Sequence, residues 1–202
     1  SDVEVAYTTY TGSALDLVVT AKDGETVLTE GTDYFLTFKD ADGNEISADS
    51  IVQADTYTVV VNGVGSYGGI QEIQFTVEPK QTTLSVTTDP ASATYDGTSK
   101  TPTVEVKDGD QTLVAGTDYK ITYIYGEETS AKDFAGAEFV EAGSYKLVIT
   151  GIGNYAGSTG ETVFEIKKDS TGTDDTNKGD DKKDDTNKGN DNTSTTDKND
   201  GN

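Results

Sequence analysis

The sequence carries one unit of about 85 residues twice, and this duplication restricts the fold more than any other feature. Three motifs recur 85 residues apart: Tyr10-x-Gly12 as Tyr95-x-Gly97, Lys22-Asp23-Gly24 as Lys107-Asp108-Gly109, and Gly31-Thr32-Asp33-Tyr34 as Gly116-Thr117-Asp118-Tyr119. Tyr57 and the run at 63–67 recur 88 residues later, and Phe75 recurs 89 residues later. The widening offset indicates small insertions in the second copy. Two domains, residues 1–80 and 81–168, are therefore predicted, each near the lower size limit for independent folding.

Within each copy, apolar residues alternate with polar ones, which is typical of half-buried β-strands. The rows expected to face inward in the first copy are Leu15, Leu17, Val19 and Ala21; Tyr34, Leu36 and Phe38; Tyr57, Val59 and Val61; and Ile73, Phe75 and Val77. The second copy repeats these rows with Pro102, Val104 and Val106; Tyr119, Ile121 and Tyr123; Tyr145, Leu147 and Ile149; and Phe164 and Ile166. No segment has a helical period, and Asp-Gly turns separate the strands. The pattern predicts an all-β protein made of two tandem Ig-like antiparallel β-sandwich domains.

The composition excludes several classes of function. The chain of 202 residues has no His and no Cys, so a Ser-His dyad, a thiol nucleophile, a disulfide and the usual zinc ligands are all excluded. All 15 basic residues are Lys, and the net charge is -22, which argues against nucleic-acid partners and anionic membranes. No apolar run reaches the length of a membrane helix. The sequence starts at Ser1 without a leader, so we expect a processed chain or a piece of a larger protein.

The composition changes abruptly near Lys168. Residues 169–202 hold ten Asp and five Lys but no aliphatic or aromatic side chain, and the hexamer Asp-Asp-Thr-Asn-Lys-Gly occurs at 174–179 and at 184–189. Such a segment buries too little apolar surface to offset the entropy lost on ordering. We predict a disordered, low-complexity linker over 169–202, which as a flexible coil would span roughly 30 Å on average.

The recurring motifs resemble a known family. The order Tyr-x-Gly, Lys-Asp-Gly, Gly-Thr-Asp-Tyr, then Ala-Asp-Thr-Tyr or Ala-Gly-Ser-Tyr, then Gly-x-Gly-x-Tyr is similar to bacterial Ig-like repeats of the MBG type, from about Val3 to Lys168. Such repeats occur in large surface proteins of Gram-positive gut bacteria, usually as spacers beside adhesins and enzymes. The resemblance therefore implies an extracellular or cell-surface segment, attached to a cell wall or secreted, that is a monomer and whose partners are adjacent domains of the same protein.

Two motifs that suggest ligands have simpler explanations. The run Gly63-Val64-Gly65-Ser66-Tyr67-Gly68 matches a dinucleotide fingerprint, but a strand-like sequence follows where that site needs a helix. Asp40, Asp42 and Asn44 begin like a calcium loop, yet Glu45 and Ile51 stand where such a loop needs Gly and Glu. We therefore interpret both as turns between strands and predict no cofactor and no dedicated metal site.

Covalent chemistry is equally disfavoured. The acids of the inserted part of the second copy, Glu127, Glu128, Glu138 and Glu141, are expected in solvated loops, where two carboxylates both stay ionised. An isopeptide bond between Lys and Asn would need burial of these groups, and the candidates Asn44, Asn62 and Asn154 all lie in or beside turns. The chain is accordingly predicted not to be an enzyme.

Tyrosines are the best candidates for a binding surface, since sugars stack on exposed aromatic rings. Tyr34, Tyr57 and their partners in the second copy, Tyr119 and Tyr145, lie on the inward rows and are expected in the core. Tyr67 and Tyr155 lie in the glycine-rich loops and Tyr125 extends a strand, so these three are the candidate ligand contacts. The predicted function is a structural spacer that presents neighbouring domains. The alternative is a carbohydrate-binding or adhesin module, with a polysaccharide partner held by these three tyrosines.

Overall fold

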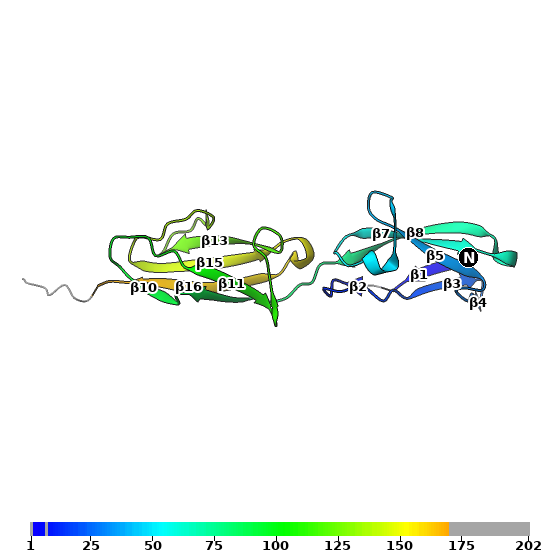
Figure 1. The fold of residues 1–202 in the computed structure, drawn as a ribbon, viewed down its shortest axis with the longest axis horizontal. Coiled ribbons are helices and arrows are strands. Elements are labelled where there is room, and N and C mark those ends of the chain that lie inside the picture. The colour runs from blue at the N-terminus through cyan, green and yellow to red at the C-terminus, as the bar shows by residue number, and fades with distance from the viewer. Residues whose placement is uncertain (1, 7, 170–202) are drawn as a thin grey trace, which may run out of the picture. The chain divides into compact units, whose positions relative to one another are not determined.

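The protein is all-β, as the sequence predicts (Figure 1). The computed structural model describes residues 2–6 and 8–169, and residues 1–169 form one unit by their contacts. The linker predicted at 169–202 falls outside the described residues except for Asp169. No helix among the described residues is long and apolar enough to cross a membrane.

The two copies have the same strand order. The strands of the first copy are β1 (Asp2–Val5), β2 (Thr8–Thr9), β3 (Val19–Asp23), β4 (Thr26–Val27), β5 (Tyr34–Lys39), β6 (Glu45–Ile46), β7 (Thr56–Gly63) and β8 (Gly69–Glu78). Those of the second are β9 (Ser85–Asp89), β10 (Ser92–Thr94), β11 (Thr103–Asp108), β12 (Gln111–Thr112), β13 (Tyr119–Tyr125), β14 (Lys132–Asp133), β15 (Gly143–Gly151) and β16 (Thr159–Lys167). The sheets are β1-β3-β4 with β2-β8-β7-β5-β6, and then β9-β11-β12 with β10-β16-β15-β13-β14. The duplication seen in the sequence is thus a duplication of topology.

The sheets are not purely antiparallel. In each copy the first part of the chain runs along the three-stranded sheet and then crosses to the five-stranded one, where β2 pairs with β8, and β10 with β16, in parallel. All other pairings between named strands are antiparallel. The predicted strand through Leu15 and Leu17 begins only at Val19, although both leucines still pack against the core. Short 3₁₀ turns, η1 (Ala48–Ser50), η2 (Gly65–Tyr67) and η3 (Gly153–Tyr155), are the helical elements described.

The core of each copy lies between its two sheets. In the first copy, Ala21 of the three-stranded sheet packs with Tyr34 and Val61 of the five-stranded sheet in one buried cluster. In the second copy, the insertion contributes a core residue of its own, since Phe139 is fully buried and its ring stacks on that of Tyr145 at 4.0 Å between centroids. A core enclosed between the inner faces of two sheets is the arrangement expected of a β-sandwich.

Candidate functional site

The glycine-rich loops at 63–69 and 151–158 begin with the same Gly-x-Gly-x-Tyr motif, and the second loop is one residue longer. Each contains a 3₁₀ turn, η2 or η3, that starts at a glycine with φ near +60° and is followed by a strand. A Cβ at Gly63 would lie 1.8 Å from the carbonyl oxygen of Tyr67, and one at Gly151 would lie 2.0 Å from that of Tyr155. Glycine is therefore required for the loop to close on itself. The interpretation of the run at 63–68 as a turn between strands is confirmed, because β8 follows it and not a helix.

In the second copy, the segment that joins the two copies lies on this loop. The backbone N–H of Lys80 donates to the carbonyl oxygen of Asn154 at 2.9 Å. The hydroxyl of Ser158, which is fully buried, donates to the carbonyl oxygen of Lys80 at 2.8 Å and accepts from the backbone N–H of Thr82 at 3.0 Å. The ammonium group of Lys80 also forms an ion pair with Asp108 at the end of β11. The joining segment is thus fixed to the second copy by backbone and side-chain bonds.

The same loop also contacts residues of the first copy. The side-chain oxygen of Asn154 accepts from the backbone N–H of Ala54 at 2.8 Å, and its amide nitrogen donates to the side-chain oxygen of Gln53. The rings of Tyr10 and Tyr155 meet edge to face, with 5.7 Å between centroids. One loop therefore binds the joining segment and the preceding copy together.

Tyr155 is a buried residue and not a ligand platform. The sequence allowed it to be exposed, and that expectation is wrong: the residue is 4% exposed. Burial and the nearby Asp108 raise the pKa of its hydroxyl to about 12. The sequence could not foresee this, because the groups that cover Tyr155 include Tyr10, far away in the chain.

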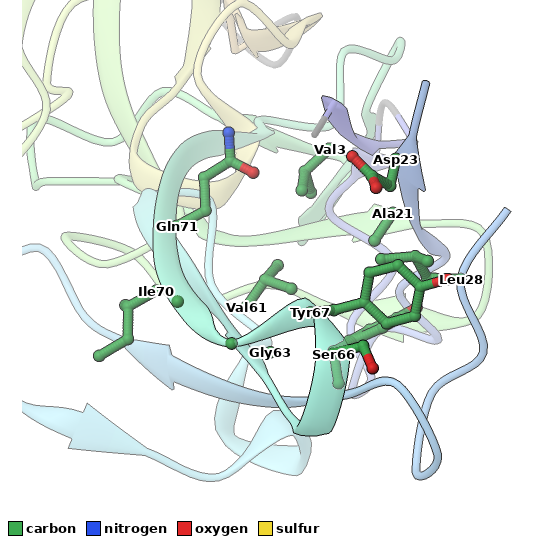
Figure 2. A pocket seen from close by; sticks show the side chains of 13 residues that line it. Val3, Ala21, Asp23, Leu28, Val61, Gly63, Ser66, Tyr67, Ile70 and Gln71 are labelled. Atoms are coloured by element: carbon green, nitrogen blue, oxygen red, sulfur yellow. The ribbon is translucent and has the colours of Figure 1, made fainter. Parts of the chain in front are cut away.

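Tyr67, the counterpart of Tyr155, is half-buried and lines a pocket of about 450 Å³ in the first copy (Figure 2). Its ring lies beside Leu28, and Val3 and Asp23 lie together on another part of the rim (Figure 2). The floor includes the buried Ala21, so the pocket has an apolar base and one carboxylate at its edge.

Tyr125 is half-buried at the far end of its sheet. Its hydroxyl donates to the carbonyl oxygen of Ala142 at 2.9 Å, and its ring lies 4.8 Å from that of Tyr145. In the pairing of β13 with β15, Tyr125 is opposite Tyr145, whereas the glycine loop starts at the other end of β15. About 20 Å of strand separates Tyr125 from that loop. The structure therefore does not bring the candidate tyrosines of the second copy onto one surface.

The acidic turns bind their own backbone. The carboxylate of Asp40 accepts from the backbone N–H of Asp42 at 3.0 Å and of Asn44 at 2.8 Å, as expected of a hairpin turn. Hydrogen bonds from Asn44 lower the pKa of Asp40. No group of three or more acidic side chains that could hold a metal ion is found in the part of the chain that the structure describes.

The remaining acids and asparagines take part in local interactions. Glu128, in the inserted part, forms a 2.7 Å ion pair with Lys132 four residues later. The amide of Asn62 donates to the hydroxyl of Thr37 and to the carbonyl oxygen of Val60. These contacts suit a role in turns and strand pairing.

The sequence analysis missed the contacts that Lys80 of the joining segment makes with Asp108, Asn154 and Ser158. One signal for them was present. The offset between the copies grows from 88 to 89 between Tyr155 and Phe164, and Ser158 lies in that interval. In comparisons with known proteins, no family model and no curated protein matches this chain.

Proposed function

We propose that this chain is a non-catalytic spacer of a bacterial cell-surface or secreted modular protein, which holds neighbouring domains at a defined separation. Its two repeats supply the folded length, and the acidic segment after residue 168 supplies a tether. The similarity to MBG-type repeats supports an extracellular location, and a chain without Cys or Met suits an oxidising environment.

The single observation that carries the proposal is the side chain of Asn154, which bonds to Gln53 and Ala54 of the first copy from a loop of the second. The carbonyl oxygen of the same residue binds Lys80 of the joining segment. A freely hinged pair of domains needs no such contacts. A stiff spacer needs them, because a junction fixed on both sides transmits orientation from one module to the next.

The proposal is tested by measuring the stiffness of the junction. The chain has no Cys, so Val27→Cys and Val163→Cys, at positions 61% and 56% exposed, give one spin label in each copy without background. Double electron–electron resonance should give one narrow distance distribution. Asn154→Ala should broaden it, whereas Ser66→Ala, the matching position in the first copy, should leave it unchanged.

A broad distribution in the parent chain would contradict a stiff spacer. The alternative, carbohydrate recognition, is tested separately by electrophoresis of the chain through gels that contain host or plant polysaccharides. We expect unchanged mobility in every gel. Retardation that disappears with Tyr67→Ala would replace the spacer by a carbohydrate-binding module.

A further inference from the structure

The pocket beside Tyr67 occupies the place at which the second copy holds its joining segment. The pairings of β1 with β3 and of β9 with β11 place Val3 opposite Ala21 and Val86 opposite Val106, so Val3 corresponds to Val86. Counting back from this pair, no described residue of the first copy corresponds to residues 80–84.

In the second copy, this segment forms one parallel bridge to β16, between Thr83 and Thr159. Leu84 donates its backbone N–H to the carbonyl oxygen of Thr159 at 2.8 Å, and the N–H of Thr159 reaches the carbonyl oxygen of Thr82 at 3.3 Å. The side chain of Leu84 is 3% exposed and belongs to the core cluster that contains Tyr155. The segment therefore contributes main-chain bonds, one apolar anchor and the Lys80–Asp108 ion pair.

In the first copy, β8 is the counterpart of β16, and its edge has no such bridge among the described residues. The registers of β7 with β8 and of β15 with β16 make Ile70 the counterpart of Thr159. Ile70 is 72% exposed, and among the described residues it has no backbone hydrogen bond of the kind that Thr159 makes with Thr82 and Leu84. A strand edge with free backbone groups next to a pocket is the arrangement that binds an extended peptide by strand addition.

The charges also match. Asp23 corresponds to Asp108 in the repeated Lys-Asp-Gly motif, lines the pocket, is exposed, and has no ion pair among the described residues. Ser66 corresponds to Asn154 and lines the pocket as well, where its carbonyl oxygen can accept a backbone N–H. A lysine in the incoming segment would thus meet a carboxylate, as Lys80 does.

One position differs. A Cβ at Gly160 would lie 2.7 Å from the carbonyl oxygen of Leu84, and the counterpart of Gly160 is Gln71. A segment bound to the first copy must therefore lie slightly farther from β8 at this point than Leu84 lies from β16.

We propose that the first copy is an acceptor for an extended linker segment of the Lys-Gln-Thr-Thr-Leu type, in line with β1. The segment pairs with the backbone of Ile70, places its leucine in the pocket beside Tyr67 and pairs its lysine with Asp23. This inference rests on the repeat geometry and does not depend on the spacer function.

The test is a graft on the full chain, in which a copy of the sequence Glu78–Leu84 replaces Ser1. Amide hydrogen exchange at Ile70 should slow by about tenfold or more, and the thermal unfolding temperature should rise. Asp23→Asn in the grafted chain should reverse part of the slowing. The matched control carries the same graft with Asp in place of the copy of Leu84 and Glu in place of the copy of Lys80, and it should not slow exchange.

Equal exchange at Ile70 in the graft and its control would overturn the proposal. Slower exchange at Ile70 that appears only when the grafted chain also carries Gln71→Gly would overturn it too. Gln71 would then prevent the segment from binding to the natural first copy. Unchanged circular dichroism of each variant at low temperature ensures that the comparison is made on folded protein.

Discussion

The two glycine loops share a motif and a 3₁₀ turn but differ in what surrounds them. The loop at 151–158 is covered by the joining segment and by Tyr10, and its tyrosine is 4% exposed. The loop at 63–69 has no such cover among the described residues, and Tyr67 is half-buried beside a pocket. The repeated motif forms the 3₁₀ turn in both loops, whereas residues outside the motif, Leu84 and Tyr10, bury the tyrosine of the second loop.

The largest expected effect comes from removing the cover of the second loop. Leu84→Ala deletes a side chain that is 3% exposed and leaves a cavity, so the free energy of unfolding should fall by about 2–5 kcal/mol. Val3→Ala, in a half-buried position of the first copy, should cost clearly less. Urea denaturation followed by circular dichroism measures both. Equal losses would mean that the two loops are covered alike.

The second prediction compares the stability of variants at one equivalent position of the two copies, Gly160 and Gln71. Gly160→Ala places a methyl group 2.7 Å from the backbone oxygen of Leu84, which cannot move aside cheaply, so we expect a loss of about 1–3 kcal/mol. Gln71→Ala in the first copy adds no Cβ, because Gln71 already carries one, and should cost clearly less. The same denaturation experiment applies. A tolerated Gly160→Ala would show that the joining segment is loosely held.

These two predictions also show what the sequence could and could not reveal. Alternation of apolar residues predicted the inward rows, and the repeat of Gly-x-Gly-x-Tyr predicted the loops, because both depend on neighbours in the chain. The burial of Tyr155 depends on Tyr10 and Leu84, which join it only in the folded chain. Likewise, Leu15 and Leu17 were predicted as strand from their alternation, but they reach the core without ladder pairing.

The ion pair at the joining segment provides a smaller contrast. Asp108→Asn removes the charge that faces Lys80, whose side chain is 42% exposed, so solvent limits the expected loss to about 1 kcal/mol. The loss should shrink in high salt. Asp23→Asn in the ungrafted chain should stay within about 0.5 kcal/mol, since Asp23 has no ion pair among the described residues. A comparable loss for both variants would contradict the assignment of Asp108 to the joining segment.

The smallest effect concerns alkaline pH. Because burial raises the pKa of Tyr155 to about 12, above the value near 10 of an unfolded tyrosine, the neutral hydroxyl contributes stability that is complete below pH 10. That contribution is lost as the pH rises from 10 to 12. Burial also raises the pKa values of Tyr34, Tyr57, Tyr119 and Tyr145. Tyr155 therefore accounts for only part of the stability lost at alkaline pH.

In Tyr155→Phe, the free energy of unfolding should therefore decrease less between pH 10 and pH 12 than in the parent chain. Urea denaturation at each pH measures this decrease. Asp108→Asn should act in the same direction, because it removes a negative charge that raises the pKa of Tyr155. An unchanged pH profile in both variants would mean that the hydroxyl of Tyr155 reaches solvent. The second loop would then resemble the first, and the joining segment would no longer explain the difference between the copies.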